Sequence, residues 1–245
     1  LKAAGAAPAA NVAEAVADAQ VIVTMLPAGK HVKSVYTSPD GIIAHAAKGA
    51  LFIDSSTIDV DSAREVGQAA QDAGFEMVDA PVSGGVAAAA AGTLTFMVGG
   101  PTAAFEKARL VLEHMGKAII HAGASGTGQA AKICNNMMLG IEMVATCEAF
   151  VLAEKLGLDS QKLFDIASKA SGQSWSLTSY CPVPGPVPAS PANRDYQPGF
   201  AAAMMLKDLR LAQDASKSAG AATPLGAHAK ELYEAFEAAG FGNTD

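Results

Sequence analysis

The chain has little of what metal, disulfide or nucleic-acid chemistry requires. Its three cysteines are odd in number, far apart and outside any Cys-x-x-Cys spacing, so we expect a reducing compartment and no disulfide framework. The five histidines are scattered without a His-Glu-x-x-His motif, which predicts no metal site. Lysine and arginine number 17 against 24 acidic residues, a net charge of −7 with no basic cluster. This balance argues against nucleic acid or an anionic membrane as a partner.

Long apolar runs and a targeting signal are also missing from the pattern. We expect no run that approaches the length of a membrane span, and no signal-peptide pattern begins at Leu1. Together with the cysteine usage, this predicts a cytoplasmic protein, or one of the mitochondrial matrix in a eukaryote. With 245 residues, the chain is long enough for one large domain or two ordinary ones.

Short apolar runs alternate with helical patterns through the first half of the chain. The runs predict buried strands at residues 20–26, 50–54, 75–79, 94–98 and 118–121. The segments between them predict helices at residues 30–36, 59–73, 86–91 and 102–115. Alternation of this kind implies crossover connections and a mostly parallel sheet covered on both faces, which is a Rossmann-like α/β fold.

The second half is helical in pattern, apart from one loop with six prolines at residues 180–199. The predicted helices cover residues 128–156, 160–170, 200–219 and 225–239. We expect Gly157 to end the long first helix and Asp159 to cap the next one. These patterns predict an α/β domain over residues 1–124, followed by an all-α domain over residues 125–245 with a long connecting helix.

A glycine-rich turn leads into that long helix and is followed by two polar residues, Lys132 and Asn136. Their spacing of four puts both side chains on one helix face, which is otherwise small or apolar. An ammonium partly withdrawn from water has a lowered pKa and suits acid–base catalysis. A solvated lysine at a helix start explains the spacing equally well, so spacing alone favours neither.

Two blocks carry a resemblance to a known family. They are Asp79-Ala-Pro-Val-Ser83-Gly84-Gly85 and the run Gly123-Ala-Ser-Gly126-Thr-Gly128-Gln-Ala-Ala-Lys132-Ile-Cys-Asn-Asn136, which together resemble the β-hydroxyacid dehydrogenase family. Further matches, in order along the chain, are Met25-Leu26-Pro27, Asp54-Ser-Ser-Thr57 and Lys207-Asp208-Leu209. The Pro-Val-Pro-Gly element of the proline-rich loop is most similar to 3-hydroxyisobutyrate dehydrogenases.

The resemblance implies that the protein uses a nicotinamide cofactor, which we expect to be NAD, with NADP as the open alternative. It also implies which residues bind the cofactor, bind the substrate and catalyse the reaction. The implied roles are catalysis by Lys132 and Asn136, substrate binding by Ser83, Gly84 and Gly85, and cofactor binding by Leu26, Pro27, Thr57 and Lys207. Domains of this kind open with a strand and a Gly-x-Gly-x-x-Gly turn that meets the pyrophosphate. This chain lacks that opening, so we interpret it as N-terminally truncated, with a partial dinucleotide-binding domain.

Each implied position also has a purely structural explanation. Ser and Thr at strand ends favour turns and helix caps, and Ser83-Gly84-Gly85 can be a simple strand-to-helix turn. An isolated Lys207-Asp208 is by default a surface ion pair. We expect Asp79, which ends a predicted strand, to be structural and to fix the turn after it.

The resemblance implies oxidation of 3-hydroxyisobutyrate to methylmalonate semialdehyde, a step of valine breakdown. Lys132 would take the hydroxyl proton as a hydride passes to the cofactor. Other short hydroxy acids stay open, including the reduction products of tartronate semialdehyde, glyoxylate and succinic semialdehyde. A phosphogluconate substrate is disfavoured because no basic cluster suits its phosphate.

Outside this class, the chain could be an inactive fragment that acts as an oligomerisation module. The wide apolar surface of the long helix predicts a homo-oligomer, a dimer or a tetramer.

Overall fold

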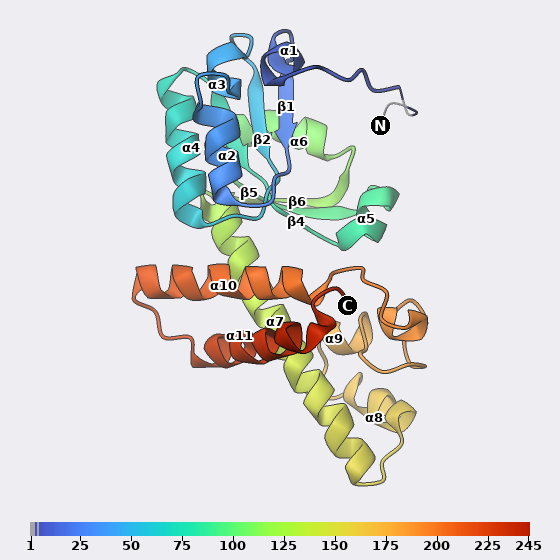
Figure 1. The fold of residues 1–245 in the computed structure, drawn as a ribbon. Coiled ribbons are helices and arrows are strands. Elements are labelled where there is room, and N and C mark those ends of the chain that lie inside the picture. The colour runs from blue at the N-terminus through green and yellow to red at the C-terminus, as the bar shows by residue number, and fades with distance from the viewer. Residues whose placement is uncertain (1–2, 4) are drawn as a thin grey trace. The chain divides into compact units, whose positions relative to one another are not determined.

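The computed structural model describes residue 3 and residues 5–245, and the chain divides into two compact units, one ending at Lys132 and one covering Ile133–Asp245 (Figure 1). The first unit alternates strands and helices as the sequence predicts. Its elements are α1 (Val12–Val16), β1 (Val21–Thr24), α2 (Gly29–Thr37), α3 (Ile42–His45), β2 (Leu51–Asp54), α4 (Val60–Asp72), β3 (Glu76–Asp79), β4 (Val82–Ser83), α5 (Gly85–Ala91), β5 (Leu94–Gly99), α6 (Thr102–Leu112) and β6 (Gly116–Gly123).

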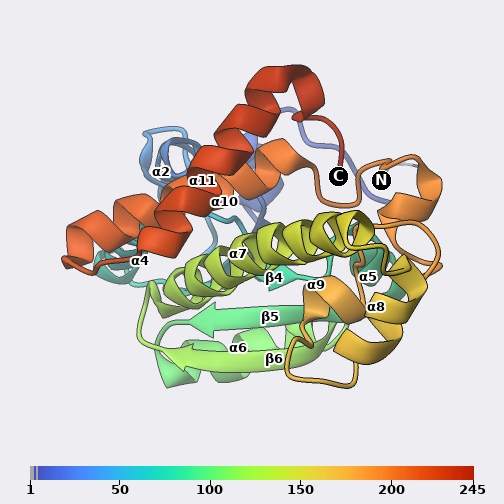
Figure 2. The same cartoon turned by 90° about the horizontal axis from the view of Figure 1, so that it is seen from below.

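The six strands of the described residues form one sheet in the order β1-β2-β3-β5-β4, with β6 beside β5. β1, β2 and β3 are parallel to one another, and β5 and β6 also run parallel, as Figure 2 shows for the latter pair. The predicted α/β fold with a mostly parallel sheet is thus confirmed. One detail differs, because β5 runs antiparallel to β3 and β4. The segment between β3 and β5 forms β4 and only a seven-residue helix, too short for a full crossover.

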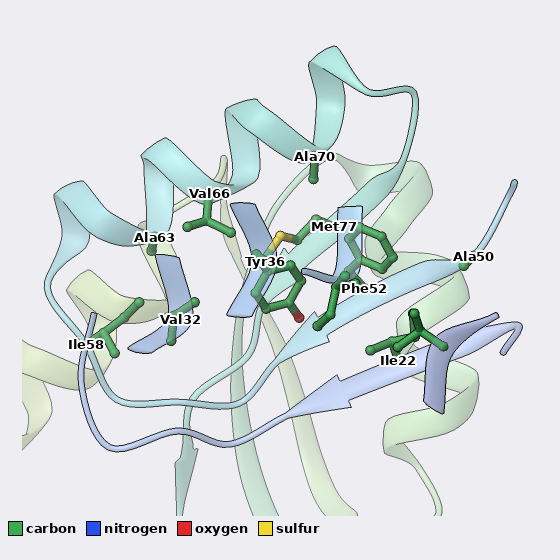
Figure 3. Close-up of a cluster of buried hydrophobic side chains, with 12 residues drawn as sticks. Ile22, Val32, Tyr36, Ala50, Phe52, Ile58, Ala63, Val66, Ala70 and Met77 are labelled. Atoms are coloured by element: carbon green, nitrogen blue, oxygen red, sulfur yellow. The ribbon is translucent and has the colours of Figure 1, made fainter. Parts of the chain in front are cut away.

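Apolar side chains alternate between the two faces of the parallel strands and build a core on each side. Phe52 faces α2 and α4, and its ring stacks on Phe75 with centroids 4.7 Å apart. In Figure 3, Val66 and Ala70 of α4 point toward the sheet in this cluster. The neighbouring Ile53 lies in the second cluster, which α6 covers. Burial on both faces explains why these strands are continuous apolar runs.

The second unit is helical, as predicted. Its elements are the greater part of α7 (Thr127–Lys155), then α8 (Ser160–Ala167), α9 (Trp175–Thr178), a 3₁₀ turn η2 (Pro191–Arg194), α10 (Ala202–Ala219), α11 (Pro224–Phe236) and a π turn η3 (Glu237–Phe241). Gly157 follows α7 with φ at +78°, and the Asp159 side chain accepts a hydrogen bond from the Lys162 N–H at the start of α8. Both predicted caps are therefore confirmed.

A core at the centre of this unit joins three helices. Met205 and Leu209 of α10 and Ala229 of α11 form its buried part, and apolar side chains from the middle of α7 pack against them. Gly140 of α7 allows this approach, because a Cβ there would lie 3.0 Å from a Leu209 methyl group. Figures 1 and 2 both show α10 and α11 side by side across α7.

The sequence prediction that no segment approaches a membrane span is wrong for α7. This helix has 29 residues and is long and apolar enough, by length and composition, to cross a membrane. The core helix of a soluble protein passes the same test. α7 carries three buried polar residues, Gln129, Lys132 and Asn136, and its middle packs against α10 and α11. Hydrocarbon disfavours such polar groups, which argues against a membrane span, while only 22% of the apolar window of α7 is buried.

Candidate active site

The loops that follow β1 and β2 are tied together by a buried polar network. The Ser56 hydroxyl accepts a hydrogen bond from the Leu26 N–H at 2.8 Å and donates one to the Asp54 carboxylate at 2.6 Å. Thr24 donates to the same Asp54 oxygen at 2.8 Å. Burial raises the pKa of Asp54, and the hydrogen bonds from Ser56 and Thr24 oppose that rise. The network fixes the carboxyl edge of the sheet, where ligands of such folds bind.

The predicted cofactor contacts of the first unit lie in these loops. Leu26 and Thr57 are half-buried and Pro27 is exposed. α2 begins next to them, and its N-cap residue Ala28 supplies no side-chain hydrogen bond. An uncapped helix N-terminus at this edge fits an anionic cofactor, because its N–H groups and dipole favour negative charge. The residues present therefore fit a dinucleotide beside β1 and β2.

Ser83, Gly84 and Gly85 lie at the other end of the strand order from these loops. Ser83 ends β4 and pairs with Thr95 of β5, and α5 begins at Gly85. The φ angles of Gly84 and Gly85 are +129° and +66°, values that favour glycine over other residues. Ser83 is half-buried and both glycines are exposed. The predicted strand-to-helix bend is thus present, with a hydroxyl and accessible backbone.

The first turn of α7 is bound to the sheet by Asp79, at the end of β3. One carboxylate oxygen accepts from the Gly126 N–H at 2.7 Å and the other from the Gln129 N–H at 2.9 Å. Asp79 is only 3% exposed, and burial raises its pKa to about 6 despite these two donors. Asp79 therefore has the structural role that was predicted, but the turn that it fixes is the start of α7 and not the turn that follows β3.

Lys132 follows this anchored turn and is 8% exposed. The interpretation as a solvated lysine at a helix start is therefore wrong. Its burial between two other buried polar residues of α7, Gln129 and Asn136, fits the partly dry setting that the sequence pattern favours for an acid–base group.

In the second unit, Asn136 and Lys207 converge on one buried carboxylate. The Asn136 side-chain N–H donates to Asp208 at 2.5 Å, and the Lys207 ammonium lies 3.3 Å from the other Asp208 oxygen. Asn135 donates to the Asn136 oxygen at 3.0 Å. Asn136 is 2% exposed and Asp208 is 3% exposed. An isolated Lys-Asp pair in the sequence suggests a solvated surface ion pair. The pair of Lys207 and Asp208 is different, because Asp208 is buried.

Two residues of this arrangement were not predicted from sequence. Gln129 is fully buried and accepts from the Ile58 N–H at 3.1 Å while donating to the Ser56 carbonyl at 2.7 Å. Asp208 links Asn136 to Lys207. Their partners lie about 70 residues away in sequence, so no local pattern marks them. The one available signal was the position of Asp208 beside Lys207 in a matched motif.

Comparisons with known proteins give a consistent result. Residues 1–140 match the model described as the NAD binding domain of 6-phosphogluconate dehydrogenase. Residues 126–245 match the NAD-binding model of NADP-dependent 3-hydroxyisobutyrate dehydrogenase. Between them the two models cover the whole chain.

Individual relatives agree with these models. The chain is 56% identical over 225 residues to a probable 3-hydroxyisobutyrate dehydrogenase of Mycobacterium tuberculosis, covering 92% of this chain and 76% of that protein. It is 47% identical over 245 residues to an NAD-dependent L-serine dehydrogenase of Pseudomonas aeruginosa, covering 100% and 82%. The structure of Mycobacterium tuberculosis 3-hydroxyisobutyrate dehydrogenase with L-serine is similar with a TM-score of 0.90 and 55% identity, covering 95% and 79%.

The sequence motifs, the fold and the similar proteins therefore indicate the same family. The chain belongs to the β-hydroxyacid dehydrogenase family, as an NAD(P)-dependent oxidoreductase of the 3-hydroxyacid type.

Proposed function

We propose that this enzyme oxidises 3-hydroxyisobutyrate to methylmalonate semialdehyde, with Lys132 as the general acid–base group. The observation that carries the proposal is the burial of Lys132, 8% exposed, on a helix whose first turn is bound by Asp79 and Gln129. A buried amine is a poor structural choice, because burial disfavours its charged form. It is well suited to proton transfer at a defined place.

The reaction divides between cofactor and protein. NAD, when bound, accepts the hydride that leaves the carbon bearing the hydroxyl. Lys132 as the neutral amine takes the hydroxyl proton in oxidation, and as the ammonium it returns a proton to the carbonyl oxygen in reduction. Proton transfer of this kind contributes about 10²- to 10⁴-fold to the rate.

The remaining residues hold the substrate in place. We assign Asn136 to orienting it by hydrogen bonding, because one N–H of its amide is engaged by Asp208, which fixes the plane of the side chain. The Ser83 hydroxyl and the backbone N–H groups of Gly84 and Gly85 bind the carboxylate. The positive φ values at both glycines turn the backbone sharply here, and both residues are exposed.

We assign the cofactor to Leu26, Pro27 and Thr57 on the loops after β1 and β2, and to Lys207 on α10. The uncapped start of α2 supports an anionic group beside those loops. We prefer NAD to NADP because a relative that matches the whole chain is named NAD-dependent. We also propose a homo-oligomer in the cytoplasm, or in the mitochondrial matrix of a eukaryote.

L-Serine is the second candidate substrate. A relative that aligns with the full length of this chain is named an L-serine dehydrogenase, and a similar structure contains L-serine. L-Serine and 3-hydroxyisobutyrate share a carboxylate and a primary hydroxyl on C3. They differ at C2, where serine carries an ammonium and 3-hydroxyisobutyrate a methyl group. The same Lys132 and carboxylate site therefore serves both.

A substrate panel tests the assignment. The purified protein is first titrated with NAD and NADP, since a failure to bind either supports the inactive oligomerisation module. Reduced cofactor is then followed by absorbance with 3-hydroxyisobutyrate, L-serine, glycerate and 4-hydroxybutyrate. We expect the highest kcat/KM for 3-hydroxyisobutyrate, with L-serine second. A higher value for any other acid contradicts the proposed substrate.

A further inference from the structure

Asp79 binds the first turn of α7 in a way that ordinary helix caps do not. Both of its oxygens accept backbone N–H groups, from Gly126 at 2.7 Å and from Gln129 at 2.9 Å. Asp59 at the start of α4 is the ordinary case in the same unit. One Asp59 oxygen accepts the Ser62 N–H at 2.7 Å, and the other accepts the Ser62 hydroxyl at 2.7 Å. A hydroxyl can turn round and accept instead of donate, whereas a backbone N–H cannot.

The same turn of α7 is seated directly on the strands. A Cβ at Gly128 would lie 2.5 Å from the Asp79 carbonyl oxygen and 2.8 Å from its carboxylate, so the helix backbone has no room to move inward. The buried Gln129 side chain binds the Ile58 N–H and the Ser56 carbonyl, and these two bonds restrain the turn against sideways movement. Asp79 supplies the remaining restraint, which keeps the turn from lifting outward.

Lys132 stands four residues after Gly128 and therefore above it on the same helix face. Side chains on a helix lean toward its N-terminus, so we expect that of Lys132 to extend back over the turn that meets β3 and β5. Any shift of the first turn is passed to the Lys132 ammonium, since the helix is continuous from Thr127.

We propose that Asp79 is the positioning residue for Lys132: its carboxylate fixes the turn of α7 that sets where the amine stands relative to the substrate. The proposal rests on the assignment of Lys132 as the acid–base group. It goes beyond that assignment because it gives an acidic residue with no substrate contact a defined effect on the chemical step.

The test compares Asp79→Asn with Asp59→Asn in the same protein. In Asp79→Asn the new amide keeps one acceptor oxygen but turns an NH₂ group toward a backbone N–H, so one bond to α7 is lost. In Asp59→Asn both bonds are kept, because the Ser62 hydroxyl can accept from the amide. We expect Asp79→Asn to lower kcat by about 10- to 100-fold through misplacement of the amine, with the KM for the cofactor unchanged. We expect Asp59→Asn to leave kcat unchanged.

A double-mutant cycle separates positioning from a general structural effect. In a Lys132→Ala background, Asp79→Asn should change the residual turnover by no more than about twofold, because the group it positions is gone. Amide hydrogen exchange without cofactor supplies a second readout. Asp79→Asn should speed exchange in residues 126–132 and leave the α4 segment at residues 60–66 unchanged. If Asp79→Asn does not fold, Asp79→Ser, which keeps one acceptor for the turn of α7, takes its place in the same cycle.

Each outcome decides one question. Equal losses from Asp79→Asn in the wild-type and Lys132→Ala backgrounds would overturn the positioning role, as would unchanged exchange in residues 126–132. Near-normal turnover of Lys132→Ala alone would instead contradict the assignment of Lys132 as the acid–base group, on which the positioning role rests.

Discussion

At the scale of single residues, Asp79 couples the stability of the fold to pH. Burial raises its pKa from 3.8 to about 6, so the folded protein holds more protons than the unfolded chain between these values. Stability contributed by this group therefore increases as the pH falls from 7 through 6, and it is complete only below the unfolded value of 3.8. From pKa values of 3.8 and about 6, the gain is about 3 kcal/mol.

The Asp79→Asn variant isolates this effect, because it removes one titrating group and leaves the others. We predict that the wild-type protein gains about 2 kcal/mol of unfolding free energy relative to Asp79→Asn between pH 7 and pH 4.5. Urea unfolding at both pH values measures the difference. A difference that does not change with pH, or that shrinks in acid, would show that burial does not control this carboxylate.

Sequence patterns locate the chemistry-bearing residues better than they locate the residues that hold them. The spacing of Lys132 and Asn136 follows from helix geometry alone. The partners of Gln129 and Asp208 do not, because they belong to loops and helices about 70 residues distant. Burial of a polar side chain depends on such partners, so the solvated and buried interpretations of Lys132 could not be separated before the fold was known.

At the scale of elements, the buried strands and the helices of about two or more turns were predictable, and the shortest helices were not. Apolar runs indicated β2 and β3, and helical periodicity indicated α4 and α10. The helices α1, α3 and α9, of four or five residues, were missed because they span little more than one turn. The direction of β5 was missed, although the short helix predicted at residues 86–91 is too brief for a parallel crossover.

The packing of β2 against α2 and α4 gives a test at this scale. Phe52 is fully buried, stacks on Phe75 and meets the Tyr36 ring edge-on with centroids 5.6 Å apart. We predict that Phe52→Ala lowers the unfolding free energy by about 3–5 kcal/mol, since a large cavity remains. Leu110→Ala on α6 is the matched control, because Leu110 is 60% exposed and should cost less than about 0.5 kcal/mol.

Thermal and urea unfolding measure both variants. A loss from Phe52→Ala no larger than that from Leu110→Ala would mean that the cluster around Phe52 does not carry the stability of this half of the sheet.

At the scale of the whole molecule, the order of motifs along the chain is what identifies the family. Five motifs in sequence are matched by two family models that together span residues 1–245. The substrate is less well determined, because 3-hydroxyisobutyrate and L-serine present the same carboxylate and hydroxyl. The side chains that distinguish the methyl group of 3-hydroxyisobutyrate from the ammonium of L-serine at C2 are not marked by any motif. The substrate panel is therefore the measurement that separates the two substrates.

Catalysis by Lys132 is tested most directly by the turnover of Lys132→Ala, with Lys155→Ala in the last turn of the same helix as the control. We predict that Lys132→Ala lowers kcat by about 10²- to 10⁴-fold while cofactor binding is retained. Lys155 is exposed, and its replacement should leave kcat unchanged. Turnover of Lys132→Ala close to that of Lys155→Ala would contradict the assignment of Lys132 as the acid–base group.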